Sequence, residues 1–425
     1  MHHFYQRSGH LRVEEISVEE LAHKHGTPLY IYSGQTIIDH FDGLTKSLYP
    51  LDHLVCYALK ANSNLAILNL LAKRGCGFDL VSGGELYRVQ QAGGDPGKCT
   101  FAGVGKTRQE IEAAMRAGVY AFNIESEAEL EVINQVAVRL KKKAPVALRV
   151  NPNVNAHTHA KVTTGTYENK FGIAFERISS LYAKASSLRD IWLRGVQMHI
   201  GSQITDVAPF ERAFRKMAPL VAELKKLHGI EFFDVGGGLG IVYEDALASG
   251  DANWWTKKDA PLTLQVYAKK LVPLLKPLGL KILVEPGRFM VGNAGILVTE
   301  VLYLKSTGKK NFIIVDAAMN DLIRPAFYDS YHEILPIAPR GTKRIMSDVV
   351  GPVCESGDFF AKDRLLPPVK QGDRLAILST GAYGFVMSSN YNTRPRPAEI
   401  LVTGKKARIV RQRETYNDIL RGETT

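Results

Sequence analysis

The chain has 425 residues, of which 45% are hydrophobic and 23% are charged. These fractions are ordinary for a folded globular protein, so they exclude collagen-like, coiled-coil and intrinsically disordered classes. The formal net charge is +11, with 54 basic and 43 acidic residues. Such an excess is compatible with nucleic acid, a membrane surface or small anionic ligands as partners. The length predicts two or three domains, or one large α/β barrel with an appendage.

Membrane and disulfide-rich classes are also disfavoured. No apolar run reaches the roughly 18 to 20 residues that a membrane helix needs, and residues 1–10 lack the apolar stretch of a signal peptide. We therefore expect a cytoplasmic protein with no membrane partner. No CxxC pair is present, and His157 and His159 are more typical of a polar loop than of a metal site. The four cysteines are Cys56, Cys76, Cys99 and Cys354.

Taken in chain order, short apolar segments alternate with longer segments of helical period between residues 54 and 284. The predicted strands are 54–59, 78–81, 100–103, 121–124, 146–150, 195–200, 232–235 and 282–284. The predicted helices between them include 66–73, 84–92, 108–117, 127–140, 207–227 and 264–275. This alternation predicts a (β/α)8 TIM barrel. A single doubly wound sheet is the alternative.

The flanking segments are rich in predicted strands. After residue 291 these strands are 297–304, 312–315, 374–378 and 400–402, and another lies at 29–32. We therefore expect a barrel over residues 34–290. The second, mainly β domain is expected to combine residues 1–33 and 291–425.

Polar residues gather at the ends of the predicted barrel strands. In a barrel, all these ends meet at the rim that carries the chemistry, so a site for a polar ligand is expected there. The residues concerned are Lys60, Asp79, 82–85, 151–153, 199–203, 236–240 and 285–288.

A phosphate site is predicted within this rim. The turn Gly236, Gly237, Gly238 can present backbone N–H groups with no Cβ in the way, and Arg288 can add a charge-assisted contact. A merely flexible turn is the alternative for the glycines taken alone.

The other rim residues favour pyridoxal 5'-phosphate as the ligand. A partly desolvated Lys60 amine can bond covalently to the cofactor's aldehyde. Glu285 can pair with the pyridine nitrogen, and His199 can lie against the ring. Lys60 could instead extend into solvent at a strand end, and His199 could be a purely structural core residue.

The β domain contains three further polar clusters. Cys354 is flanked by Glu355 and by small or acidic residues, which is unusual for a cysteine of the core. Arg324 and Tyr328 lie in a loop-like segment, and Tyr383 follows an apolar strand.

The chain resembles the diaminopimelate decarboxylase family, barrel-type pyridoxal-phosphate enzymes related to alanine racemase. The resemblance covers nearly the whole chain and rests on segments in a fixed order. They are YALKAN at 57–62, NKFGI at 169–173, HIGSQ at 199–203, DVGGGLG at 234–240, EPGR at 285–288, CESGD at 354–358 and GAY at 381–383. It implies decarboxylation of meso-diaminopimelate to L-lysine, with Lys60 holding the cofactor.

The resemblance also implies roles for the other residues. Cys354 would protonate the carbanion left by CO2, Glu355 would hold the distal ammonium, and both would enter the barrel mouth of a second subunit in a homodimer. Arg288, Arg324, Tyr328 and Tyr383 complete the substrate set. The implied cofactor-binding set is Lys60, Asp79, His199, Ser202, Gly236, Gly237, Gly238, Glu285, Gly287, Arg288 and Tyr383.

Several alternatives stay open at this point. A decarboxylase of ornithine or arginine would share the cofactor segments, but it would favour acidic groups where Arg324 lies. A racemase would gain nothing from the Cys354 loop, and a non-catalytic homologue would be expected to lose Lys60 or Cys354. The basic tail, residues 405–413, could bind nucleic acid, but its alternation favours a strand with a solvated basic face, and no nucleic-acid partner is expected.

Overall fold

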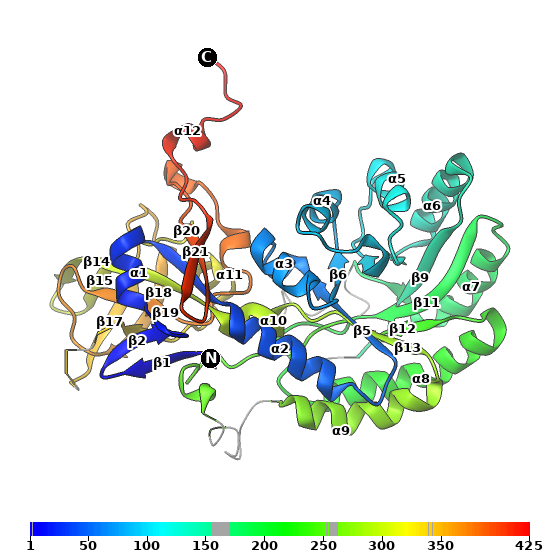
Figure 1. The fold of residues 1–425 in the computed structure, drawn as a ribbon, viewed down its shortest axis with the longest axis horizontal. Helices are drawn as coiled ribbons and strands as arrows, with labels where there is room; N and C mark the ends of the chain where they lie inside the picture. Colours follow the sequence, from blue (N-terminus) through cyan, green and yellow to red (C-terminus); the bar gives the residue numbers. More distant parts are fainter. Residues whose placement is uncertain (2, 155–169, 252–253, 255–261, 339, 342) are drawn as a thin grey trace. The chain divides into compact units, whose positions relative to one another are not determined.

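The computed structural model describes residues 1, 3–154, 170–251, 254, 262–338, 340–341 and 343–425 (Figure 1). They form two compact units. The first consists of Met1–Asp39, Ile241–Ala260 and Met290–Thr425. The second consists of His40–Gly240 and Pro261–Phe289.

The second unit is a closed barrel of eight parallel strands. These are β5 (His53–Ala58), β6 (Gly77–Leu80), β7 (Cys99–Phe101), β8 (Ala121–Ile124), β9 (Ala144–Asn151), β11 (Ile191–Met198), β12 (Phe232–Asp234) and β13 (Lys281–Val284). The pairing of β13 with β5 and of β8 with β9 closes the ring. This closure confirms the predicted barrel and excludes the doubly wound sheet. A short strand, β10 (Ile173–Ala174), pairs in parallel with the end of β9.

Helices lie on the outside of the barrel strands (Figure 1). They are α3 (Leu65–Ala72), α4 (Gly83–Gln91), α5 (Arg108–Ala117), α6 (Glu127–Leu140), α7 (Ile178–Ser186), α8 (Ala208–His228) and α9 (Leu264–Leu275). Local chemistry sets their ends: α5 begins with a capping box between Thr107 and Glu110 and ends at left-handed Gly118. Among the helices of the described ranges, none is both long enough and apolar enough to cross a lipid bilayer.

The first unit is built on a mixed β-sheet. Its strands are β4 (Leu29–Ser33), β14 (Gly295–Ser306), β15 (Asn311–Val315), β16 (Ile334–Pro336), β17 (Ile345–Val350), β18 (Phe359–Leu366), β19 (Arg374–Ile377), β20 (Ala398–Thr403) and β21 (Lys406–Arg411). The N-terminal strand β4 is fully buried and pairs antiparallel with β14 and parallel with β20. The basic tail forms β21, an antiparallel partner of β20, which confirms the predicted strand. Its first four residues are all exposed, so the expected alternation of a buried and a solvated face is not seen there.

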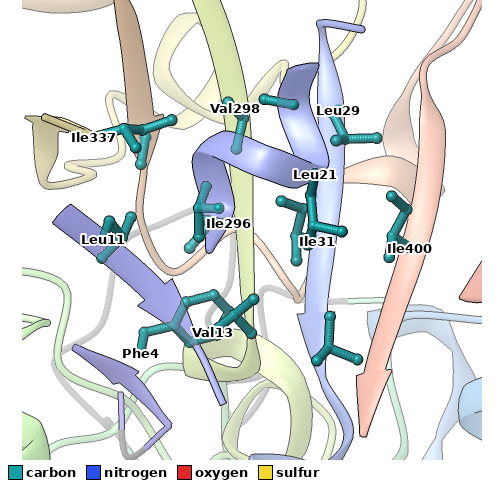
Figure 2. Close-up of a cluster of buried hydrophobic side chains, with 14 of the residues drawn as sticks. Phe4, Leu11, Val13, Leu21, Leu29, Ile31, Ile296, Val298, Ile337 and Ile400 are labelled. Atoms are coloured by element: carbon teal, nitrogen blue, oxygen red, sulfur yellow. The ribbon is translucent and has the colours of Figure 1, made fainter. Parts of the chain in front are cut away.

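The core of this unit joins segments that are distant in sequence. Ile31 of β4, Ile296 of β14 and Ile400 of β20 form one buried cluster (Figure 2). Leu21 of helix α1 (Val18–His25) packs onto it, together with Phe4 from the small sheet of β1 (Phe4–Arg7), β2 (His10–Val13) and β3 (Ile16–Ser17). Burial of these side chains stabilises the domain by about 1.5 to 3 kcal/mol each.

Candidate active site

Lys60 lies at the mouth of the barrel. Strand β5 ends at Ala58, and a single 3-10 turn, η1 (Leu59–Ala61), then carries the lysine between two fully buried residues. Its Nζ is 3.8 Å from Oδ2 of Asp79 on β6, and its side chain is 46% exposed. The amine is therefore both accessible and held near a buried carboxyl group.

Asp79 is a buried acid with a strongly perturbed pKa. Burial raises the pKa of Asp79 to about 8, Glu285 adds to this increase, and Lys60 opposes it. The neutral form is therefore the main form at neutral pH in the cofactor-free protein.

This pKa predicts how Asp79 changes stability with pH. In the unfolded chain Asp79 ionises near pH 4, whereas in the folded chain it keeps its proton up to about pH 8. The unfolded state thus binds fewer protons between these values, and the contribution of Asp79 to the free energy of unfolding falls as pH rises. An asparagine at this position does not titrate. We expect urea unfolding of the two cofactor-free proteins to show this difference. From pH 5 to pH 7.5, the free energy of unfolding of Asp79→Asn should rise by about 1 to 3 kcal/mol relative to that of wild type.

The exposed Asp52 supplies the control for this comparison. Asp52→Asn makes the same change from carboxyl to amide at an exposed position. A stability difference between Asp79→Asn and wild type that stays constant with pH would contradict the assignment of a neutral buried Asp79.

Glu285 follows β13 directly and is held by a ring of polar side chains inside the barrel. Its Oε1 accepts from Asn123 Nδ2 at 3.2 Å and from Thr100 Oγ1 at 3.3 Å, and its Oε2 accepts from Gln197 Nε2 at 3.1 Å. Burial, together with the nearby Asp234, raises the pKa of Glu285 well above its ordinary value. Glu285 therefore keeps a proton, which it shares in a hydrogen bond with Asp234.

The supporting residues Thr100, Asn123, Gln197 and Asp234 are absent from the sequence-based prediction of the site. A signal for them does exist, because Thr100, Asn123 and Asp234 are each the polar residue of an otherwise apolar, buried strand, and Gln197 lies in the buried second half of β11. Strands of a parallel barrel are apolar on both faces unless a residue points at a partner or ligand inside.

The glycine turn after β12 packs tightly against the ends of neighbouring strands. A Cβ on Gly236 would lie 2.4 Å from the carbonyl oxygen of Met198, and a Cβ on Gly237 would lie 2.2 Å from that of Glu285. Gly238 has φ +110°, and its Cβ would lie 2.7 Å from the carbonyl oxygen of Gly201. Only glycine satisfies these approaches.

Hydrogen bonds fix the direction of the turn. The N–H of Gly236 donates to Asp234 Oδ1 at 2.9 Å, and that of Gly237 donates to His199 Nδ1 at 3.2 Å. Two of the three N–H groups expected to face a phosphate are thus used inside the protein, and Gly238 supplies the remaining one. Because His199 Nδ1 accepts, its ring is neutral, and burial beside Lys60 and Arg149 lowers the pKa of His199 well below its usual value.

Gly237→Ala tests the turn directly. The added methyl group would clash with the Glu285 carbonyl oxygen, so the turn must shift, and we expect the Kd for pyridoxal phosphate to rise at least about tenfold. The matched control is Gly105→Ala, because a Cβ on Gly105 meets nothing within 4 Å. Equal Kd values for the two variants in a fluorescence titration would show that the turn plays no part in cofactor binding.

An anion-binding pair lies beside the turn. Arg288, which follows Gly287 and is 6% exposed, donates from Nη2 to Ser202 Oγ at 3.3 Å. The loop carrying Ser202 is tied to the turn, because Ile204 N–H donates to the Gly238 carbonyl oxygen at 2.9 Å. Ser202, Gly238 and Arg288 therefore form a suitable cradle for a phosphate.

Together, the barrel residues fit pyridoxal phosphate. The mouth offers an accessible amine, a glycine turn with a cationic side chain beside it, and a buried acid that can meet a ring nitrogen. Each feature matches one part of the cofactor, namely its aldehyde, its phosphate and its pyridine ring.

The first unit carries the other predicted residues. Cys354 and Glu355 are exposed in the loop between β17 and β18. Asp358 shapes this loop, because Oδ1 accepts from Met319 N–H and Oδ2 accepts from Val353 N–H, both at 2.7 Å. Its buried carboxyl group leaves Cys354 and Glu355 directed outward.

Arg324 opens the short helix α11 (Arg324–Tyr328) and is 5% exposed. Its Nε donates to His332 Nε2 at 3.3 Å and its Nη2 donates to Ser330 Oγ at 3.1 Å, so the guanidinium is held in one orientation. Its guanidinium carbon lies 5.9 Å from the ring of Tyr328. Tyr383 adopts the left-handed region, with φ +56°, an unusual backbone conformation that is common near functional sites.

The predicted residues thus fall into two groups. Lys60, Asp79, His199, Ser202, Gly236 to Gly238, Glu285, Gly287 and Arg288 belong to the barrel, and Arg324, Tyr328, Cys354, Glu355 and Tyr383 belong to the other unit. His157, His159 and Asn169 lie outside the described residues.

Comparison with known proteins identifies the family to which this chain belongs. Residues 35–292 match the family model of the pyridoxal-dependent decarboxylase, pyridoxal binding domain. The diaminopimelate decarboxylase of Vibrio cholerae is 49% identical over 98% of this chain and 97% of its own. A crystal structure of diaminopimelate decarboxylase from Helicobacter pylori complexed with L-lysine is 41% identical, has a TM-score of 0.89 and covers 95% of this chain and 98% of that one. The chain therefore belongs to the diaminopimelate decarboxylase family of pyridoxal-dependent decarboxylases.

Proposed function

We propose that this chain decarboxylates meso-diaminopimelate to L-lysine and CO2 with pyridoxal phosphate as its cofactor. The observation that carries the proposal is the full-length similarity to diaminopimelate decarboxylases, since it spans the barrel mouth and the Cys354 loop alike. Bound pyridoxal phosphate supplies an aldehyde that condenses with amines and a ring that takes up the electron pair released as CO2 leaves.

The barrel residues hold and tune the cofactor in this proposal. Lys60 would hold the cofactor covalently through its aldehyde. Glu285 would face the pyridine nitrogen and pair with it, which would keep the ring protonated. Ser202, Gly238 and Arg288 bind the phosphate, with Gly236, Gly237 and Gly287 shaping the cradle. Asp79, His199 and Tyr383 complete the cofactor's surroundings.

The residues of the other unit recognise the substrate. Glu355 would bind the distal ammonium, and Arg324, Tyr328 and Arg288 would bind the distal carboxylate and neighbouring groups. Tyr383 would also contact the substrate. Cys354 donates a proton to the carbon that loses CO2. Ornithine lacks the distal carboxylate and would leave Arg324 facing no anion, a mismatch that polar sites reject strongly.

A single assay tests the substrate. Purified enzyme should release CO2 from meso-diaminopimelate and form lysine, while ornithine and arginine give rates lower by about two orders of magnitude or more. Release from ornithine with none from diaminopimelate would replace this proposal with the decarboxylase of another basic amino acid.

The proposal includes a homodimer with shared sites and a cytoplasmic location. The exposure of Cys354 and Glu355 in one chain supports the first part, because residues needed for chemistry should be enclosed by a second surface. Four free thiols support a reducing compartment. We retain residues 34–290 as the cofactor-binding domain, and the family match over 35–292 supports these bounds. The compact barrel unit is narrower, since residues 34–39 and 241–260 belong to the other unit.

A further inference from the structure

The segment 389–396 has no role in the site described so far, yet its backbone is unusual. Asn392 and Thr393 both adopt positive φ, +55° and +56°. This region is unfavourable for side chains, and above all for a β-branched one, so it persists only where neighbouring contacts impose it. Thr393 N–H donates to the Asn390 carbonyl oxygen at 2.8 Å, and Asn390 Nδ2 donates to that of Arg394 at 3.0 Å.

Contacts on both sides hold this turn in place. Arg394 Nε donates to Asn320 Oδ1 at 3.0 Å, and Ser389 N–H donates to the Asn320 carbonyl oxygen at 2.9 Å. On the other side, Glu414 Oε2 accepts from Asn390 Nδ2 at 2.7 Å and from Arg396 N–H at 2.9 Å. A network of this kind fixes the direction of the side chains that the turn carries.

The same neighbouring segment also supports the Cys354 loop. Met319, next to Asn320, donates its N–H to Asp358 Oδ1. Gly351 packs closely against Ala317, because a Cβ on Gly351 would lie only 2.7 Å from the carbonyl oxygen of Ala317. Residues 316–321 therefore place the turn and the loop in a fixed relation to one another.

One side chain bridges the turn and the loop. The hydroxyl group of Tyr391 donates to Glu355 Oε2 at 2.8 Å. We propose that Tyr391 is a positioning residue that orients the Glu355 carboxylate for the amino group at the distal end of the substrate. This inference rests on the proposed function of Glu355.

The physical reason is preorganisation. An exposed glutamate samples several rotamers, and binding an ammonium selects one of them at an entropic cost. The phenol fixes one carboxylate oxygen beforehand and leaves the other for the ligand. The hydrogen bond to Glu355 also raises the pKa of Tyr391, so the phenol keeps its proton and remains a donor.

The test is a double-mutant cycle on the holoenzyme with meso-diaminopimelate. Tyr391→Phe removes only the hydroxyl group and should raise KM about three- to tenfold while kcat changes less than about twofold. Glu355→Ala should raise KM further. In that background Tyr391→Phe should have no additional effect, because the group it orients is gone.

Tyr416→Phe is the matched control, since Tyr416 is 71% exposed on the C-terminal helix α12 (Tyr416–Ile419), and it should leave KM unchanged. An unchanged KM in Tyr391→Phe, beside a raised KM in Glu355→Ala, would overturn the inference and leave the proposed function intact. An equal effect of Tyr391→Phe with and without Glu355 would also overturn it. Wild-type enzyme inactive on diaminopimelate would instead refute the proposed function.

Discussion

The purified protein with bound pyridoxal phosphate should be yellow, and Lys60→Ala should remove this colour and lower kcat by at least about three orders of magnitude. The amine at the mouth of the barrel is the group positioned to bond with the cofactor's aldehyde. Its side chain is nearly half exposed, so an aldehyde can reach its amine. An absorbance spectrum and a CO2-release assay measure the two effects separately.

The control for this experiment is Lys269→Ala on helix α9, which replaces an exposed lysine far along the chain. It should keep both colour and activity. If Lys60→Ala kept the visible absorbance of wild type after dialysis, another group would have to hold the cofactor, and the site would need to be rebuilt around that group.

Chains carrying Lys60→Ala and chains carrying Cys354→Ala should each be nearly inactive alone and regain activity when co-expressed. If each site combines Lys60 of one subunit with Cys354 of the other, a hybrid dimer has one site with both residues and one with neither. Random pairing makes half of the dimers hybrids, so recovery should approach about one quarter of wild-type activity. Two affinity tags allow the hybrid to be purified and its rate measured.

A second pair of variants tests whether the recovered activity comes from shared sites. The other explanation is that one chain merely stabilises the other in the mixed dimer. Lys60 and Glu285 both belong to the barrel unit, so Lys60→Ala and Glu285→Ala chains should not rescue one another. Hybrids of Lys60→Ala and Cys354→Ala that stay inactive would show that each site is built within one chain.

Much of the fold could be predicted because the barrel has a strong local signal. Most barrel strands are short apolar runs followed by a helix, and the bounds of α5 and α6 match the prediction. Helix α7 is short, with serines at three of its nine positions, so its period is weak. Strand β17 begins with two exposed apolar residues and β18 carries three charged ones, and neither forms the continuous apolar run that marks a buried strand.

The site was predictable where residues stand at strand ends and unpredictable where they act through distant partners. Lys60 lies just beyond the end of β5 and Arg288 just beyond that of β13, so the barrel rule places them at the rim. The bond between Tyr391 and Glu355 joins residues 36 positions apart on two irregular loops. No periodic pattern in the sequence predicts such a contact. The hydrogen bonds of the Gly236 and Gly237 N–H groups to Asp234 and His199 likewise depend on how the chain packs.

The position of β4 has a consequence for synthesis on the ribosome. This apolar strand emerges roughly 260 residues before its partner β14 and roughly 370 before β20. At about 5 to 20 residues per second it waits about 13 to 52 s for the first of these partners, and all eight barrel strands are synthesised in that interval. A nascent chain that stops between residues 306 and 398 would leave β4 with an open edge, exposed to chaperones or to aggregation.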